Sequence, residues 1–179
     1  MLLSNKFNKT LLDLNQKVIK LTEQTHKFLN KDANFITADM FNMPLEDCSF
    51  DIVFNAGVIE HFSLEERISA LHEYARVLKN DGIMYIAFPN HFSIPYKVAY
   101  IILRLFKKWP YPMEYQILNL KKEIKANNLN FNERIVLSKG SLFNWLYFSK
   151  ILKNFFLFLD KFINFEGYLT VIKITKNTQ

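Results

Sequence analysis

The sequence predicts an α/β fold with a mostly parallel sheet. Two short apolar runs, at residues 35–37 and 50–54, are each followed by small or polar residues. A helix-rich segment comes before them, and a glycine turn with a further apolar run at residues 83–88 comes after them. Strands and helices that alternate along a chain are typical of parallel sheets, because each parallel connection needs a crossover.

Local signals predict the first elements. A short apolar run ends at Asp13, which predicts a strand, and Asn15 can then cap a helix that reaches about residue 29. After a polar turn, a second strand is expected at residues 34–38. The strand at residues 50–55 is expected to be buried.

The clearest helix signal begins at Ser63. Glu66 follows three residues later and completes a capping-box pattern, in which each side chain bonds the backbone N–H of the other residue. Apolar residues then recur at helical spacing. Gly82 is expected to end this helix before the strand at residues 83–88.

The second half of the chain predicts aromatic-rich helices and two more strands. Residues 94–109 are mostly apolar with basic residues between them. The elements expected after them are an amphipathic helix at 114–127, a strand at 130–137, a long aromatic segment at 141–164 and a closing strand at 167–175. We expect a single domain over residues 1–179, with helical insertions at about 94–112 and 141–164.

Composition limits the class of protein. Half of the 179 residues are hydrophobic, which is enough for one buried core. Cys48 is the only cysteine, which excludes a disulfide framework and a multi-cysteine zinc site, so we expect no metal and a cytoplasmic protein. Residues 1–3 lead into polar residues and not into a long apolar leader. The net charge of +6 is spread without a basic run of five residues, which argues against nucleic-acid binding.

Small and polar residues stand where two predicted strands end. The candidates are Asp39 and Met40 after the first of these strands, Asn55, Ala56 and Gly57 after the second, and Glu60 with His61 one step further on. Ligands of an open parallel sheet bind beyond the carboxyl ends of its strands. These residues are therefore expected at the rim of a pocket, and an ordinary α/β loop is the alternative.

Together these segments resemble the class I S-adenosylmethionine-dependent methyltransferases, especially the branch that acts on small molecules and lipids. The matching motifs are Leu11-Leu-Asp-Leu-Asn15, Ala38-Asp39-Met40 with Met43-Pro44-Leu45, Phe50-Asp51-Ile-Val53 with Val58-Ile59-Glu60-His61, and Arg76-Val-Leu-Lys79 with Asp81-Gly82. They follow the family's order through most of the chain. The resemblance implies a Rossmann-like methyltransferase sheet with an antiparallel closing strand, and S-adenosylmethionine as the cofactor.

The resemblance also implies roles in binding the cofactor. It gives Asp13, with Leu14 beside it, the position of the acid that holds the ribose hydroxyls. A carboxylate is a double acceptor and suits two vicinal hydroxyls, although Asp13 can instead stabilise a helix N-terminus. Asp39 can accept a hydrogen bond from the adenine amine or close an Asx turn. Met40 can pack on the adenine ring.

The fourth-strand motif is expected to serve the methionine end of the cofactor and the chemistry. Asn55, Ala56 and Gly57 would leave the backbone open to that end of the ligand. Glu60 and His61 are expected beside the sulfonium. His61 can act as a general base on an acceptor hydroxyl, and the alternative is a structural histidine at a helix entry.

One family motif has no counterpart in the sequence. The four glycines lie far apart, so no Gly-x-Gly loop exists, and only twelve residues precede Asp13, fewer than the roughly 30 that a βα unit needs. The predicted sheet therefore lacks its first strand and helix. We expect a fragment of a longer enzyme, with an inactive remnant or completion by a partner chain as alternatives. Loss of a central strand would leave apolar strand edges exposed.

The aromatic segments 94–109 and 142–163 bear on the acceptor. Both contain charged residues, unlike membrane spans. Aromatic residues mixed with lysines suit an interfacial helix or a lid over an apolar substrate, and burial in the core is the alternative. We therefore expect a small-molecule or lipid-like acceptor, and peripheral membrane contact through these two segments.

The sequence thus predicts S-adenosylmethionine-dependent methyl transfer to such an acceptor. A catalytically inactive methyltransferase-like module, or a peripheral membrane protein, is the alternative. A nicotinamide-dependent reductase on a similar sheet usually carries a Tyr-x-x-x-Lys pair. No tyrosine in this sequence has a lysine four residues on, which argues against that class.

Overall fold

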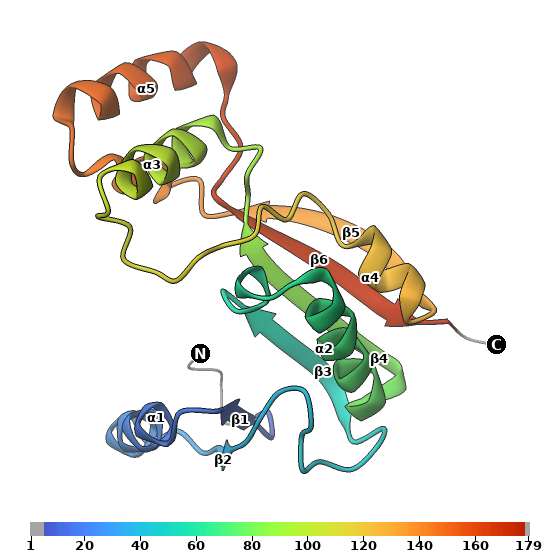
Figure 1. Cartoon of the computed structure of the whole chain (residues 1–179). Coiled ribbons are helices and arrows are strands. Elements are labelled where there is room, and N and C mark those ends of the chain that lie inside the picture. The colour runs from blue at the N-terminus through green and yellow to red at the C-terminus, as the bar shows by residue number, and fades with distance from the viewer. Residues whose placement is uncertain (1–5, 178–179) are drawn as a thin grey trace. The chain divides into compact units, whose positions relative to one another are not determined.

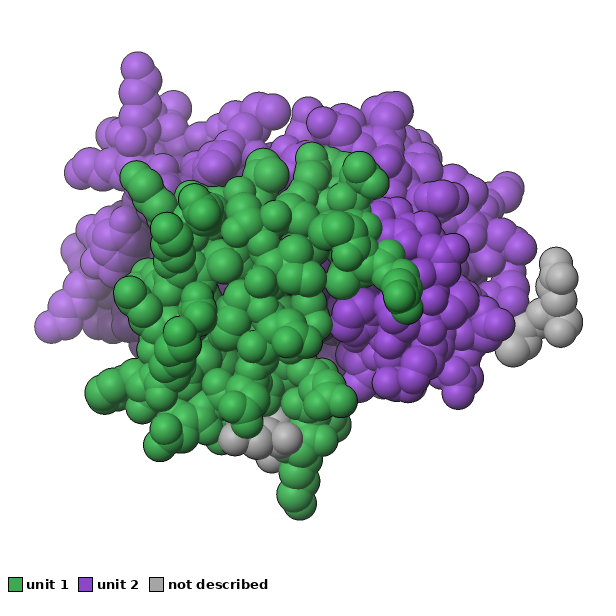
Figure 2. Space-filling view, turned by 90° about the horizontal axis from the view of Figure 1, so that it is seen from below, with its two compact units in different colours: residues 1–46 green, residues 47–179 purple. Residues whose placement is uncertain are grey.

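A computed structural model describes residues 6–177 of the chain (Figure 1). The chain divides into two compact units, Met1–Glu46 and Asp47–Gln179, which Figure 2 colours separately. The expectation drawn from residues 1–3 lies outside the described residues.

The first unit is a small parallel β/α arrangement. Its elements are β1 (Thr10–Asp13), α1 (Gln16–Phe28) and β2 (Asn34–Thr37). The two strands pair in parallel, with Thr10 opposite Asn34 and Asp13 opposite Thr37. Asn15 caps α1 as predicted, because its side-chain oxygen accepts a hydrogen bond from the backbone N–H of Lys17 at 2.9 Å. Short-range signals were sufficient to predict this unit.

The second unit is built on a four-stranded mixed sheet. Its strands are β3 (Phe50–Ala56), β4 (Leu78–Pro89), β5 (Leu129–Leu137) and β6 (Leu169–Lys176), in the order β3-β4-β6-β5. β3 and β4 are parallel, and β6 runs antiparallel to both β4 and β5. The antiparallel closing strand is therefore present, and the α/β prediction is confirmed.

Helices α2 (Leu64–Val77) and α4 (Lys121–Ala126) lie on one face of this sheet (Figure 1). Met84, Ile86 and Ile174 are fully excluded from solvent in the core. The predicted capping box at the start of α2 is present: Glu66 donates its backbone N–H to Oγ of Ser63, and its carboxylate accepts from the Ser63 backbone N–H at 2.7 Å. The packing of α2 fixes the turn that precedes it, where the candidate site lies.

The prediction of a buried strand at 50–55 is wrong. β3 is the edge strand of its sheet, and Ile52 and Phe54 are 54% and 48% exposed. Asn55 bonds Tyr74 of α2, so alternation turns Ile52 and Phe54 to the opposite face of the sheet. An apolar run can thus form an edge strand, because its burial depends on neighbours that lie elsewhere in the sequence.

The sequence predicted that Gly82 ends a helix, and this prediction is wrong. Helix α2 ends at Val77, and β4 begins at the next residue because Leu78 pairs with Phe50. A Cβ atom on Gly82 would lie 2.7 Å from the side chain of Leu78. The glycine therefore permits a close approach within the strand rather than forming a turn.

The helix predicted at 114–127 is limited to Lys121–Ala126. The backbone before it is irregular, and Tyr115 donates its N–H to the carbonyl of Glu60 at 2.7 Å. The apolar residues Ile117 and Leu120 are nevertheless buried, as the pattern predicted.

Two helical segments form an aromatic cluster beyond the sheet. They contain α3 (Ile94–Leu105), the 3₁₀ turn η2 (Leu142–Leu146) and α5 (Lys150–Ile163) (Figure 1). Tyr96, Leu146 and Phe156 lie in the buried centre of this cluster. α3 begins five residues after the end of β4, so this cluster lies next to the carboxyl end of a parallel strand.

Candidate functional site

In the first unit, Asp13 and Asp39 follow two neighbouring parallel strands. The backbone N–H of Ala38 donates to the Asp13 carbonyl at 3.2 Å, so both acids stand at the same edge of the pair. Oδ1 of Asp13 accepts from the backbone N–H of Asn15 at 2.7 Å, and Oδ1 of Asp39 accepts from that of Phe41 at 3.0 Å. The Asx turn considered for Asp39 is thus present, and each carboxylate is held in one orientation by its own loop.

The two apolar candidates of this unit differ in exposure. Leu14 is exposed, and Met40 is half-buried. Both lie directly beside the acids at the ends of β1 and β2. The structure therefore brings the four candidates of this unit to one edge of its sheet.

In the second unit, the chain turns sharply after β3. Gly57 has φ +70°, in the left-handed region that favours glycine, and its N–H donates to the Ala87 carbonyl at 3.1 Å. Ala56 and Gly57 are exposed. Asn55 differs from them, because its Nδ2 donates to Oη of Tyr74 at 2.8 Å and its side chain therefore points toward α2. Of these three predicted residues, Ala56 and Gly57 leave open backbone.

Glu60 lies directly beneath this turn, in the 3₁₀ turn η1 (Ile59–His61). It is only 3% exposed, and a Cβ atom on Gly57 would lie 3.8 Å from its Oε1. Burial is the main reason that the pKa of Glu60 is raised to about 6; the Glu114 carboxylate adds to the rise, and a backbone hydrogen bond and His61 oppose it. Its Oε2 atom is buried and has no hydrogen-bond partner among the described residues. A carboxyl group in this state is typical of functional sites.

His61 is held by the loop that follows α3. Its Nδ1 lies 3.0 Å from the carbonyl oxygen of Met113. Because a carbonyl only accepts, Nδ1 is the donor, and Nε2 is then the acceptor nitrogen of the neutral ring. Tyr115, two residues after Met113, donates its N–H to the Glu60 carbonyl. The same loop segment thus positions both Glu60 and His61.

The sequence analysis missed a second buried acid in this place, Glu114. Its Oε1 accepts from the Trp109 indole N–H at 3.1 Å and its Oε2 from the Tyr96 hydroxyl at 3.3 Å. Burial raises its pKa. The signal was an acid directly after an aromatic and proline-rich break, but the sequence analysis placed it at the exposed start of a helix.

A buried histidine was also missed. His91 comes two residues after β4 ends, and its ring contacts Tyr96 and Tyr100 edge-on, with centroids 5.9 and 5.8 Å apart. Burial lowers its pKa to about 4, so the ring is neutral at pH 7. Neither ring nitrogen has a hydrogen-bond partner in the described part of the chain. The carboxyl ends of β3 and β4 thus carry several buried titratable groups.

Comparisons with known proteins show which family the first half of the chain resembles. Residues 2–86 match the family model described as "Methyltransferase domain". Over these residues the chain is similar to the methyltransferase family. The matched part holds the candidates from Asp13 to His61. The resemblance to class I methyltransferases is therefore confirmed for this part of the chain.

Two curated relatives match shorter segments. The probable tRNA methyltransferase 9B of Mus musculus is 41% identical over 58 residues, which are 32% of this chain and 13% of the relative. The phthiotriol/phenolphthiotriol dimycocerosates methyltransferase of Mycobacterium tuberculosis is 38% identical over 73 residues, 41% of this chain and 26% of the relative. The matches thus span about a quarter or less of these two relatives.

The solved structures agree in fold. Geranyl diphosphate C-methyltransferase from Streptomyces coelicolor A3(2) superposes with a TM-score of 0.63 at 13% identity, over 94% of this chain and 62% of the other. That enzyme was crystallised with Mg²⁺, geranyl diphosphate and S-adenosyl-L-homocysteine. The likeness confirms the Rossmann-like methyltransferase fold.

Proposed function

We propose that the chain transfers a methyl group from S-adenosylmethionine to a small or lipid-like acceptor. The match of residues 2–86 to the methyltransferase family supports this proposal most directly. Two similar proteins support the acceptor class, because they are named for geranyl diphosphate and for the lipid phthiotriol. An inactive methyltransferase-like module is the alternative.

Each unit, taken by itself, carries residues that suit a part of the cofactor. Asp13 would accept from the ribose hydroxyls, beside Leu14, and Asp39 and Met40 would bind the adenine. The exposed turn at Gly57 lacks a side chain, so backbone at Ala56 and Gly57 can approach the methionine end. The cofactor supplies an electrophilic methyl group. The protein's task is then to align the acceptor, which accounts for much of the rate enhancement in two-substrate reactions.

Glu60 is the better candidate for the general base. With a pKa of about 6, it is ionised at pH 7.5 and still basic enough to accept a proton. Its buried Oε2, which has no partner among the residues described, is the atom that would take the proton from an acceptor hydroxyl. His61 would be the second candidate, acting through Nε2.

Calorimetric titration of S-adenosylhomocysteine tests the proposal. We expect the 179-residue chain to bind it, and Asp13→Asn to weaken binding by roughly 10–100-fold, because hydrogen bonds to a charged group contribute about 1.5–3 kcal/mol. Glu65→Gln, which removes an exposed charge on α2, is the matched control and should leave the affinity unchanged. Absence of binding would favour the inactive module.

The exposed side of α5 favours a second proposal, peripheral membrane contact through segments 142–163 and 94–109. One row of α5 is apolar and exposed, with Ile151 at 86% and Phe162 at 74%, and it continues through two further phenylalanines, Phe155 and Phe158. Lys150 and Lys161 lie along one flank of this row at helical spacing. This arrangement is typical of helices that lie in a membrane interface. Within residues 6–177, no helix is long and apolar enough to cross a membrane.

Sedimentation with vesicles tests membrane contact. We expect binding to vesicles of phosphatidylcholine with 30% phosphatidylglycerol, and the double variant Phe158→Ser/Phe162→Ser should bind roughly 10-fold more weakly, because it removes buried apolar area. Phe131→Ser, at an equally exposed phenylalanine on β5, is the control. Equal loss in the control, or no binding at all, would contradict the proposal.

A further inference from the structure

A groove of about 210 Å³ lies beside the candidate site of the second unit. The residues that line it come from the end of α3 and the loop after it: Arg104, Lys107, Trp109, Tyr111, Pro112 and Met113. Two of these residues are cations, the other four are apolar or aromatic, and none is an acid.

The guanidinium of Arg104 is held by Tyr100, and the backbone of Lys107 is fixed at the end of α3. The guanidinium of Arg104 lies 5.7 Å from the centre of the Tyr100 ring and donates to its hydroxyl. Lys107 adopts φ +55° just after α3, where its N–H donates to the Arg104 carbonyl at 3.0 Å and the Lys108 N–H to that of Leu103 at 2.7 Å. Within residues 6–177, no carboxylate forms an ion pair with Arg104 or Lys107.

The position of Lys107 is unusual for a lysine. The two hydrogen bonds form a Schellman motif, whose left-handed residue is usually glycine or asparagine. A residue with a side chain is less stable there than in a right-handed conformation. The helix end thus carries a cation at the groove in a position where glycine would be less strained.

The apolar part of the groove is rigid. The Trp109 indole is fixed by its hydrogen bond to Glu114 at 3.1 Å and stacks on Trp145, with ring centres 5.2 Å apart. Tyr111 contacts the edge of Trp109 at 5.8 Å. An apolar chain placed on these rings would therefore bind a preformed surface, with little loss of side-chain entropy.

The groove adjoins the proposed catalytic residues. Met113, which lines it, accepts the hydrogen bond from His61 at 3.0 Å, and Tyr115, two residues on, bonds the Glu60 backbone at 2.7 Å. A molecule in the groove therefore lies against the segment that positions both candidate bases.

We propose that this groove binds an anionic amphiphile, a molecule with a phosphate group on an apolar chain. The phosphate binds Arg104 and Lys107, and the chain lies on Trp109, Tyr111 and Met113. The volume equals that of about seven water molecules at roughly 30 Å³ each, enough for the head group and the first carbons of the chain. That the bound molecule is also the methyl acceptor rests on the proposed function.

Tryptophan fluorescence provides the test, because Trp109 lines the groove and Trp145, the other tryptophan of the chain, stacks on it. Octyl phosphate is titrated against octanol in the absence of cofactor. We expect octyl phosphate to bind at least about 10-fold more tightly, since two cations face its head group. Arg104→Gln/Lys107→Gln should abolish this preference and leave octanol binding unchanged. Lys121→Gln/Lys122→Gln, on α4, is the matched control.

Three results would overturn the inference. They are equal binding of octyl phosphate and octanol, a preference that persists in the Arg104→Gln/Lys107→Gln variant, and inorganic phosphate that binds as tightly as octyl phosphate. The last would indicate a site for a free anion. The titration omits the cofactor, so a negative result would contradict the groove proposal without contradicting the methyl-transfer proposal. Likewise, if S-adenosylhomocysteine does not bind, the result of the groove titration is unaffected.

Discussion

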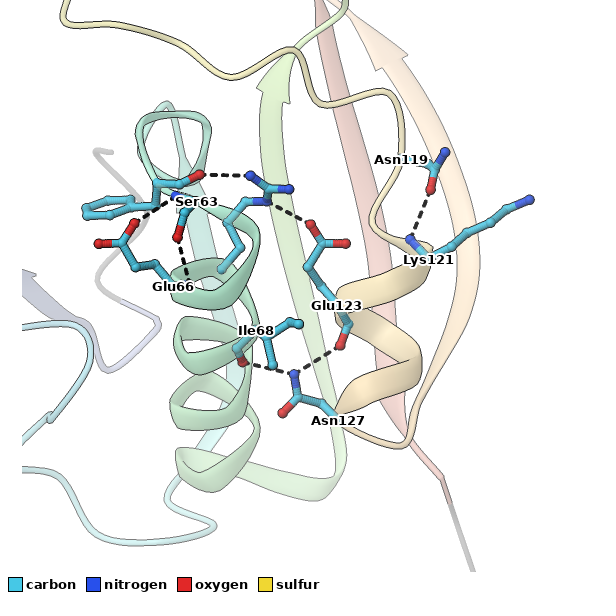
Figure 3. A network of polar contacts seen from close by, with 9 residues as sticks. Ser63, Glu66, Ile68, Asn119, Lys121, Glu123 and Asn127 are labelled. Carbon is cyan, nitrogen blue, oxygen red and sulfur yellow. Dashed lines mark hydrogen bonds and ion pairs between the residues drawn. The ribbon is translucent and has the colours of Figure 1, made fainter.

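Replacing Glu123 with alanine is expected to lower the free energy of unfolding by about 3–5 kcal/mol, because it leaves a buried guanidinium without its partner. Nε of Arg67 on α2 lies 2.7 Å from Oε1 of Glu123 on α4, and the two side chains are 11% and 2% exposed (Figure 3). Arg67 also donates to the Phe62 carbonyl at 2.8 Å. The pair thus joins two helices that cover the same face of the sheet.

Urea unfolding followed by tryptophan fluorescence measures this effect, since both tryptophans lie in the same unit as the pair. Asp51→Asn, which breaks the exposed Lys79–Asp51 pair at 2.7 Å, is the control and should hardly change the midpoint. The double variant Arg67→Met/Glu123→Leu should be more stable than Glu123→Ala, because it leaves no unpaired charge. A loss below about 1 kcal/mol in Glu123→Ala would contradict this account.

Elements defined by short-range signals could be predicted from the sequence. The capping box of Ser63 and Glu66 and the Asn15 cap depend on residues two or three positions apart, so the sequence contains all of the information. The burial of a strand depends on its neighbours. Ile52 and Phe54 are exposed because they lie on the face of β3 opposite to α2, and the order β3-β4-β6-β5 is set by pairings between distant segments.

The candidate site divides in the same way. Glu60 and His61 were predicted because they follow directly after an apolar run, where parallel sheets bind their ligands. Glu114 was missed because its burial comes from Tyr96 and Trp109 together, through contacts that helical periodicity does not encode. A periodic pattern predicted a helix from Glu114, but the helix begins only at Lys121, and the irregular segment before it bonds the Glu60 carbonyl through Tyr115.

Replacing Glu60 with glutamine is expected to lower the rate of methyl transfer by about 10²–10⁴-fold at pH 7.5, the usual contribution of a general base. In the wild type, the rate should fall tenfold for each pH unit below about 6, where the Glu60 carboxyl becomes protonated. The measurement is single-turnover transfer between pH 4.5 and 8.5. Unchanged affinity for S-adenosylhomocysteine is the control. A variant that keeps the rate and pH profile would instead favour His61 as the base.

The same carboxyl group should affect stability in the opposite direction. Its folded-state pKa of about 6 lies above its ordinary value of 4.5, so the neutral form stabilises the fold. That contribution is fully present below pH 4.5 and is lost as the pH rises through 6, where ionisation of the buried group costs about 2 kcal/mol. Glutamine stays neutral, so Glu60→Gln should be more stable than the wild type by about that amount at pH 8, and by little at pH 4.5. Urea unfolding at both pH values measures the difference. If the difference in stability between Glu60→Gln and the wild type is the same at pH 4.5 and pH 8, Glu60 ionises without cost. Its strength as a base would then have no physical reason.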